Sequence, residues 1–238
     1  LEDLGTVYGQ VAQKEPQSLP GKTSSYAQWA KLLDEKAQSD KFKRQFEYWS
    51  GRRSVNRLPL DFPEHSSDNK TRDARTVTVH LTTAETESLL RDVPSVYHTQ
   101  INDVLLSALL VVFNEWTGKD QLYLELEGHG REELERNVDI TRTVGWFTTI
   151  FPVLLEKTSS DLGGLLPSVK EQLRQIPDNG IGYGLLRYLS QDESVRSALA
   201  SPPRAQISFN YLGQSDQLQS DNAAFTMSQD EIASGQSD

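Results

Sequence analysis

Cysteine is absent from this chain of 238 residues, which excludes thiolate catalysis, zinc–thiolate sites and iron–sulfur clusters. Basic residues are also scarce, since 24 Lys and Arg stand against 34 Asp and Glu and the formal net charge is −10. Phosphate binding needs clustered Lys and Arg, so we expect no nucleic-acid partner. No apolar run approaches the roughly 20 residues that span a bilayer, and no signal-peptide pattern is present. We therefore expect no membrane partner and a cytoplasmic location.

A length of 238 residues is enough for one large domain or for two lobes. The apolar spacing predicts a helix over residues 1–13, then a loop over 14–24 and a second helix capped by Ser25. A third helix is expected over 41–49. The polar segment 51–73 has no sustained period, so we place a lobe junction there and divide the chain between residues 72 and 73.

Beyond that junction the pattern changes to mixed strands and helices. Residues 75–81 alternate strictly and predict a strand. Thr82 is expected to cap a short helix that ends before Pro94, and Thr99 to cap a long helix over 100–116. The other expected elements are strands at 121–127 and 206–211, a buried strand or strand pair around Pro152 within 143–156, and helices at 168–176, 185–190 and 194–200.

The segment Glu127-Gly-His-Gly-Arg-Glu132 places a carboxylate, an imidazole and a guanidinium around one turn. Its two glycines let the backbone turn sharply after a strand. The residues alone indicate either a proton-transfer or anion-handling site or a solvated turn, because Glu127 lies on the same polar face as Tyr123 and Glu125. Both interpretations stay open on spacing alone.

Neighbouring segments add to this string. In order and spacing, five segments resemble the core motifs of epimerization domains of nonribosomal peptide synthetases, which belong to the condensation-domain superfamily. The resemblance covers residues 1 to about 213, and the glutamate–glycine–histidine–glycine–arginine–glutamate string is the one that separates epimerization from ordinary condensation domains. The five segments are 100–106, 127–132, 142–152, 180–184 and 208–213.

The resemblance implies a mixed α/β (α+β) chain with the chloramphenicol-acetyltransferase-like fold, in which two lobes form a V around an active-site channel. Residues 1–72 would close the N-terminal lobe, and residues 73–238 would begin a C-terminal lobe that is incomplete here. Within the second lobe we expect 214–238 to be a mobile loop, because the segment is polar and has few apolar residues.

The implied activity is that of an isomerase. It inverts the α-carbon of an aminoacyl or peptidyl residue, from L to D, while that residue is held as a thioester on the phosphopantetheine arm of a peptidyl carrier protein. The resemblance implies no metal or other cofactor, and it implies that neighbouring synthetase domains are partners. The alternatives are a condensation-type acyltransferase that forms a peptide bond on the same carrier, and a non-catalytic lobe that only docks a carrier protein.

Site residues follow from the resemblance by position. The family's two bases are a histidine from a two-histidine motif and a glutamate, which here is Glu127. His129 is expected to orient Glu127 or to stabilise the turn, with a purely structural role as the alternative. Asn210 and Tyr211 match an asparagine–tyrosine element near the channel. Tyr211 is either a core residue, since alternation puts it on an apolar face, or a hydrogen-bond donor near the enolate oxygen or the bound thioester.

Two further expectations concern neighbours of these residues. Arg131 is expected to pair with a nearby carboxylate such as Glu132 or Asp139 rather than to touch the substrate, and Gly180–Gly184 is expected to form a tight turn. The two-histidine motif is not in this sequence, because the four histidines are His65, His80, His98 and His129 and none are adjacent. We therefore expect these 238 residues alone to be inactive or nearly so.

Overall fold

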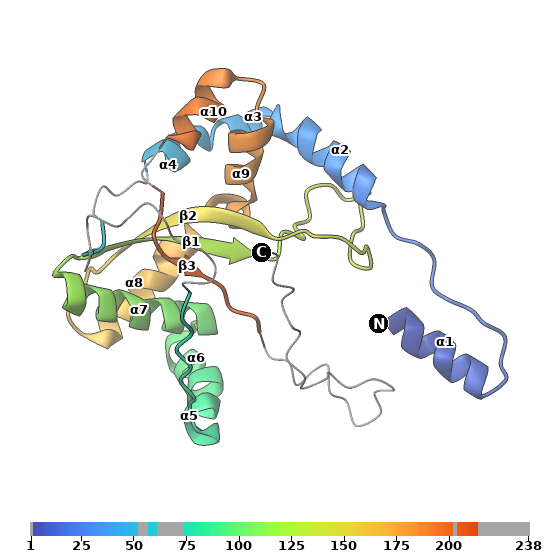
Figure 1. The fold of residues 1–238 in the computed structure, drawn as a ribbon, viewed down its shortest axis with the longest axis horizontal. Helices are drawn as coiled ribbons and strands as arrows, with labels where there is room; N and C mark the ends of the chain where they lie inside the picture. The colour runs from blue at the N-terminus through green and yellow to red at the C-terminus, as the bar shows by residue number, and fades with distance from the viewer. Residues whose placement is uncertain (1, 52–56, 61–73, 202–203, 214–238) are drawn as a thin grey trace. The chain divides into compact units, whose positions relative to one another are not determined.

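A computed structural model describes residues 2–51, 57–60, 74–201 and 204–213. The chain divides into a compact unit, Ser24–Asn210, and a second unit made of Leu1–Thr23 and Tyr211–Asp238. The second unit contains α1 (Glu2–Ala12), which confirms the first expected helix (Figure 1). The expected division at 72/73 and its lobe assignments stay predictions, and the expected mobile loop at 214–238 lies outside the described residues.

The centre of the compact unit is a three-stranded sheet with the order β2-β1-β3 (Figure 1). Strand β1 (Gln121–Gly128) pairs antiparallel with β2 (Thr149–Glu156) and parallel with β3 (Ser208–Phe209). The strand expected at 121–127 is therefore confirmed. The strands expected at 143–156 and 206–211 are shorter than predicted.

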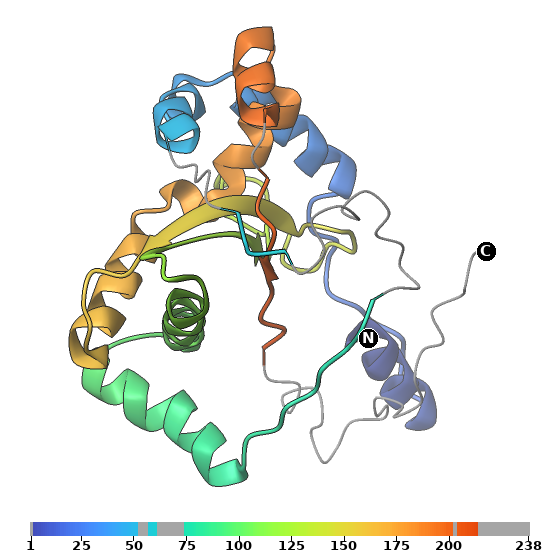
Figure 2. The same cartoon turned by 60° about the vertical axis from the view of Figure 1, so that its left-hand side comes forward.

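One face of this sheet is the main core. Leu122, Leu124 and Leu126 alternate along β1 and are buried, and their cross-strand partners in β2 are apolar as well. Helices α7 (Ile101–Thr117) and α8 (Leu162–Arg174) lie beneath this face (Figures 1 and 2). The apolar cluster built on this face also extends beyond it, and its other buried members are Trp49, Leu106, Leu110, Phe151, Val153, Leu155, Leu165, Val169, Leu186 and Leu199.

Helix α7 confirms the expected long helix but corrects its cap. Gln100 is the N-cap residue, and its backbone N–H donates to the Asp103 carboxylate at 2.7 Å. Thr99 lies one residue earlier, with a buried hydroxyl that has no hydrogen-bond partner in the described part of the chain. The sequence could not separate the two residues as caps, because both precede the apolar stripe.

Helix α2 (Tyr26–Ala37) anchors a second core. Its predicted cap is confirmed, because the Ser25 hydroxyl accepts from the Gln28 N–H at 3.2 Å. The single helix expected at 41–49 is instead two short helices, α3 (Asp40–Lys43) and α4 (Phe46–Gly51). The buried residues of this second core are Trp29, Leu32, Ala37, Phe42, Ile140, Phe147, Ile181 and Leu185.

A run of short turns follows α8 and completes the second core. The 3₁₀ turn η4 (Pro177–Gly180) leads into α9 (Ile181–Gly184), the π turn η5 (Leu185–Leu189) and α10 (Glu193–Ala200). The tight turn expected at 180–184 is thus helical, and the sharp bend precedes it. The helix expected at 194–200 is confirmed by α10, the one expected at 185–190 is a π turn, and the one expected at 168–176 begins earlier, at Leu162.

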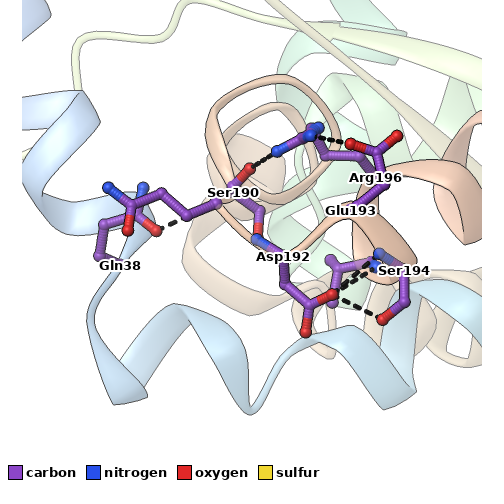
Figure 3. A network of polar contacts seen from close by, with 8 residues as sticks. Gln38, Ser190, Asp192, Glu193, Ser194 and Arg196 are labelled. Carbon is purple, nitrogen blue, oxygen red and sulfur yellow. Dashed lines mark hydrogen bonds and ion pairs between the residues drawn. The ribbon is translucent and has the colours of Figure 1, made fainter.

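A polar network joins α10 to the end of α2 (Figure 3). The Asp192 carboxylate accepts from the Ser194 N–H at 2.8 Å and from the Ser194 hydroxyl at 2.6 Å, which lowers the pKa of Asp192. Arg196 donates to the Ser190 carbonyl, and Gln38 accepts from the Gln191 N–H at 3.1 Å. These bonds fix the chain between η5 and α10 against α2.

The strand expected at 75–81 is wrong. Val77 and Val79 are 88% and 82% exposed, and this extended segment joins no ladder in the described part of the chain. The Thr82 cap is confirmed for α5 (Thr83–Glu87), but the helical path continues through η3 (Ser88–Asp92) and α6 (Val93–Tyr97). The path is continuous across Pro94, since the π turn η3 leads directly into α6 and Pro94 is the second residue of α6.

No single helix of the described residues is long and apolar enough to cross a membrane. One pair, Thr83–Tyr97 with Ile101–Thr117, meets the length and composition criteria only jointly, and it is bent by 97°.

Candidate active site

Glu127 lies near the end of β1 and is half-buried, directly across the sheet from Ile150 of β2. On its other side, the parallel pairing sets Leu126 beside Phe209, so Asn210 comes next to Glu127. The side-chain amide Nδ2 of Asn210 donates to Oε2 of Glu127 at 2.7 Å. The structure therefore brings together two of the four expected site residues and orients the carboxylate.

The turn after β1 needs its two glycines. A Cβ at Gly128 would lie 2.8 Å from the Thr149 hydroxyl oxygen. Gly130 has φ +67°, and a Cβ there would lie 1.6 Å from the carbonyl oxygen of Phe147. Because that contact is with backbone, no rotamer change can relieve it. The close approach fixes the chain at 128–130 against the segment that leads into β2.

His129 is held inside this turn. Its Nδ1 accepts from the Arg131 backbone N–H at 3.0 Å, and its Nε2 lies 3.6 Å from a Glu132 oxygen. Asn179 donates to the other oxygen of Glu132 at 2.8 Å. These contacts have the geometry expected of a residue that stabilises the turn, and none of them involves Glu127. A contribution of His129 to the reaction stays a prediction.

The expectation for Arg131 is wrong. In the described part of the chain its guanidinium pairs with neither Glu132 nor Asp139. It donates instead to the carbonyl oxygens of Ile140 and Thr143, and it lies 4.0 Å above the centroid of the Phe147 ring. Two carbonyls and a ring face satisfy the planar guanidinium. Arg131 thus holds the loop 140–147 closed over the turn.

Asp139, the other carboxylate considered for Arg131, has local partners. It accepts from the Thr141 backbone N–H at 2.9 Å and from the Thr141 hydroxyl at 2.7 Å, and these bonds lower the pKa of Asp139. Tyr211, the remaining expected site residue, is half-buried and belongs to the other unit. Its role stays a prediction.

A cavity of about 580 Å³ lies on the same face of the sheet as the Glu127 side chain, although Glu127 itself does not line it. Both neighbours of Glu127 on the same face of the sheet line it: Glu125, two residues back along β1, and Ile150, directly across on β2. This volume is within the usual range of ligand pockets. The aromatic residues that line the cavity are Tyr26, Trp29, Trp49, Tyr123, Trp146, Phe147, Tyr183 and Tyr188.

Sequence reasoning missed Ile150, Asn179 and Arg187 as residues at or near the site. Ile150 and Arg187 line the cavity, and Asn179 supports the turn through Glu132. The sequence held no signal for these three residues. The alternation of β1 indicated only that Glu125, which also lines the cavity, lies on the same face of the sheet as Glu127. Among the described residues, no three His, Asp or Glu side chains form a group that could hold a metal ion.

Similarity to known proteins places the chain in one family. A family model described as "Condensation domain" matches residues 1–237. The chain belongs to the condensation-domain family. Its curated relatives include a subunit of linear gramicidin synthase of Brevibacillus parabrevis, 44% identical over 232 residues, which are 97% of this chain and 3% of the relative. Surfactin synthase subunit 1 of Bacillus subtilis (strain 168) is 42% identical over 241 residues, which are 100% of this chain and 7% of the relative.

Two solved structures resemble this chain to different degrees in sequence and in fold. The epimerization domain from the third module of tyrocidine synthetase B has a TM-score of 0.79 at 39% identity, covering 88% of this chain and 48% of that one. The first condensation domain of the calcium-dependent antibiotic synthetase has a TM-score of 0.57 at 12% identity, covering 87% of this chain and 43% of that one, so it shows the fold alone. The expected mixed α/β class and chloramphenicol-acetyltransferase-like fold are confirmed. This chain spans about half of the epimerization-domain structure.

Proposed function

We propose that the domain containing this chain inverts, from L to D, the α-carbon of an aminoacyl or peptidyl thioester on the phosphopantetheine arm of a carrier protein. The observation that carries the proposal is the Glu127 carboxylate, which Asn210 orients at 2.7 Å and whose same-face neighbours Glu125 and Ile150 line a cavity of about 580 Å³. It stands in the glutamate–glycine–histidine–glycine–arginine–glutamate string that distinguishes epimerization domains. The likeness to the tyrocidine epimerization domain, at 39% identity, supports the same subclass.

The chemistry suits one carboxylate and one further group. A thioester acidifies its α-hydrogen because sulfur donates poorly into the carbonyl, which then accepts the electron pair as an enolate. Glu127 takes the α-proton from one face, the C–H electron pair moves into the enolate, and a second group delivers a proton to the opposite face. Glu127 has then gained a proton and the second group has lost one, and proton exchange with solvent restores the starting state of both groups.

The second group is outside these 238 residues in this proposal. The resemblance assigns it to a histidine of the two-histidine motif, which this sequence does not contain. The phosphopantetheine is the tether of the substrate and belongs to the carrier protein, so this chain itself needs no cofactor for the reaction. The partners are accordingly the carrier protein and neighbouring synthetase domains, which is consistent with relatives of which this chain spans 3% and 7%.

A condensation-type acyltransferase is the second candidate, and the family match over residues 1–237 favours it as much as it favours epimerization. A condensation reaction joins an amine to the thioester carbonyl, and it leaves the α-carbon unchanged. A carrier-docking lobe without catalytic activity would change neither bond. The three candidates therefore differ in what happens to the α-carbon and to the carbonyl.

The discriminating experiment loads a carrier protein with an L-amino acid and incubates it with the intact domain that contains this chain. The amino acid is released by base hydrolysis and resolved by chiral chromatography, and peptide products are sought in parallel by mass spectrometry with a second loaded carrier present. Epimerization predicts a mixture of L and D amino acid and no peptide. Peptide formation without D amino acid would contradict this proposal and indicate an acyltransferase. If neither D amino acid nor peptide forms, the proposal is also contradicted, and the result indicates a lobe that only docks the carrier.

A further inference from the structure

The cavity beside Glu127 has walls from several parts of the compact unit. Ile150 and Pro152 come from β2, Glu125 from β1, and Trp29 from α2. The aromatic walls brace one another: the Trp49 and Tyr183 rings are 5.5 Å apart, and the Tyr26 and Phe147 rings are 5.2 Å apart. Interlocked aromatic rings of this kind make a preformed wall that keeps its shape.

The position of the cavity relative to the carboxylate is set by the sheet. Directly opposed residues of an antiparallel pair have their Cβ atoms about 5 Å apart, so the Ile150 side chain stands next to that of Glu127. Ile150 is 49% exposed, and it lines the cavity together with Thr149 and Gly130 of the neighbouring backbone. A substrate α-carbon within reach of Glu127 therefore has its side chain within reach of the cavity mouth.

The charged residues of the wall restrict what this cavity can accept. Arg187 is already engaged, because its guanidinium donates to the Leu199 carbonyl at 2.6 Å and to the Tyr183 hydroxyl at 3.1 Å. Burial opposes the charged form of Arg187, but the neighbouring Tyr183 and Tyr188 outweigh it and raise the pKa of Arg187. Glu125 is half-buried and would repel an acidic side chain. Arg204 is the third charged residue of the wall, and the rest of the lining consists mostly of aromatic and aliphatic side chains.

We propose that this cavity receives the side chain of the amino acid being inverted, that it favours large aromatic side chains over small ones, and that Ile150 sets the size limit next to the carboxylate. The inference rests on the proposed function, and it names the substrate class for the same site. An aromatic side chain that leaves water for this cavity buries apolar area against aromatic walls, whereas a methyl group buries little. Apolar pockets of this kind discriminate by about tenfold or more between side chains that differ by several carbons.

The test compares carriers loaded with L-phenylalanine and with L-alanine, using the intact domain that contains this chain. In deuterated water, the rate of α-deuterium uptake is expected to be at least about tenfold higher for phenylalanine. Ile150→Trp adds bulk at the mouth of the cavity while keeping a good strand former on an exposed position of β2. We expect it to lower the ratio of the phenylalanine rate to the alanine rate by at least about tenfold.

Leu154→Trp is the matched control. Leu154 lies on the same strand and the same face as Ile150, four residues further on, but it does not line the cavity. The same added bulk there is expected to leave the ratio of phenylalanine to alanine rates unchanged. Equal rates for the two substrates in the native domain, or an Ile150→Trp variant that slows both equally, would overturn the inference.

A binding measurement separates this inference from the proposed function. Carriers that bear a non-hydrolysable phenylalanyl or alanyl amide are titrated into the domain, and their dissociation constants are compared. Tighter binding of the phenylalanyl carrier, lost in Ile150→Trp but kept in Leu154→Trp, supports the cavity even if no deuterium exchange occurs, in which case only the proposed function fails. Equal binding of both carriers overturns the cavity assignment whatever the exchange data show.

Discussion

Asn210 donates a 2.7 Å hydrogen bond to the carboxylate of Glu127, a residue 83 positions earlier in the chain. The parallel pairing of β1 and β3 creates this contact, since it sets Glu125 beside Ser208 and Leu126 beside Phe209. The amide can donate without adding charge, so it fixes the direction of the carboxylate and leaves it able to act as a base. The contact gives Asn210 a physical role in positioning Glu127.

Replacement of Asn210 by aspartate should change the pH dependence of epimerization. Two carboxylates within hydrogen-bond distance cannot both ionise readily, so one proton would be retained on the pair to higher pH. Glu127 acts only when deprotonated, and the acidic limb of the rate–pH profile should therefore move upward in Asn210→Asp. The measurement is the rate of D amino-acid formation between about pH 5 and pH 9, where about a tenfold loss near pH 7 should recover at higher pH.

Asn210→Ala is the control for that experiment, since it removes the hydrogen bond without adding a charge. We expect it to lower the rate across the whole pH range and to leave the position of the acidic limb unchanged. An Asn210→Asp profile that only falls in height, without moving, would contradict the account of this pair.

Gly130 and Gly118 offer a matched test of the close approach between the backbone of Gly130 and the carbonyl of Phe147. Both have positive φ, +67° and +66°, but only a Cβ at Gly130 meets backbone, since nothing lies within 4 Å of one at Gly118. Gly118→Ala should cost about 1–2 kcal/mol, as expected for an L-residue in the left-handed region. Gly130→Ala should lower the free energy of unfolding by more than about 3 kcal/mol. Urea unfolding of the two variant domains would check this, and similar losses would show that the turn can move away from Phe147.

Arg131→Lys should loosen the loop 140–147 although it keeps the charge. An ammonium cannot donate to two separate carbonyls and cover the Phe147 ring in the way that the planar guanidinium does. Amide hydrogen exchange within 140–147 should therefore become faster, by at least about fivefold, with little change in α7. Arg136→Lys, at an exposed position of the same connection, serves as the control. Unchanged exchange in Arg131→Lys would mean that the loop is held by other contacts.

Local signals in the sequence predicted the elements whose causes are local. The capping boxes at Ser25 and Thr82 confirm this, because the partner of each cap lies three residues away. Strand β1 was predictable because its leucines alternate and face a core made by α7. Residues 75–81 have the same alternation, yet they join no ladder in the described part of the chain, since a strand also needs a partner that its own pattern does not specify.

The site residues show the same difference between features with local causes and features that depend on distant partners. Position within the motif string indicated Glu127, and the resemblance indicated Asn210, but neither could show that the two side chains touch. Arg131 was assigned to a carboxylate because charge pairing is the simplest expectation from sequence. Its observed partners are the carbonyls of Ile140 and Thr143 and the ring of Phe147, which lie 9 to 16 positions later in the chain. Contacts with backbone leave no compositional signal.

The central claim is that Glu127 removes or delivers the α-proton, and Glu127→Gln in the intact domain tests it most directly. Glutamine keeps the size of the side chain and can still contact Asn210, but it cannot take up a proton. The domain is incubated with a carrier bearing an L-amino acid in deuterated water, and α-deuterium in the released amino acid is measured by mass spectrometry. We predict a loss of at least about a hundredfold in exchange rate with unchanged thermal unfolding. Undiminished exchange in the folded variant would contradict the assignment of Glu127 as a base.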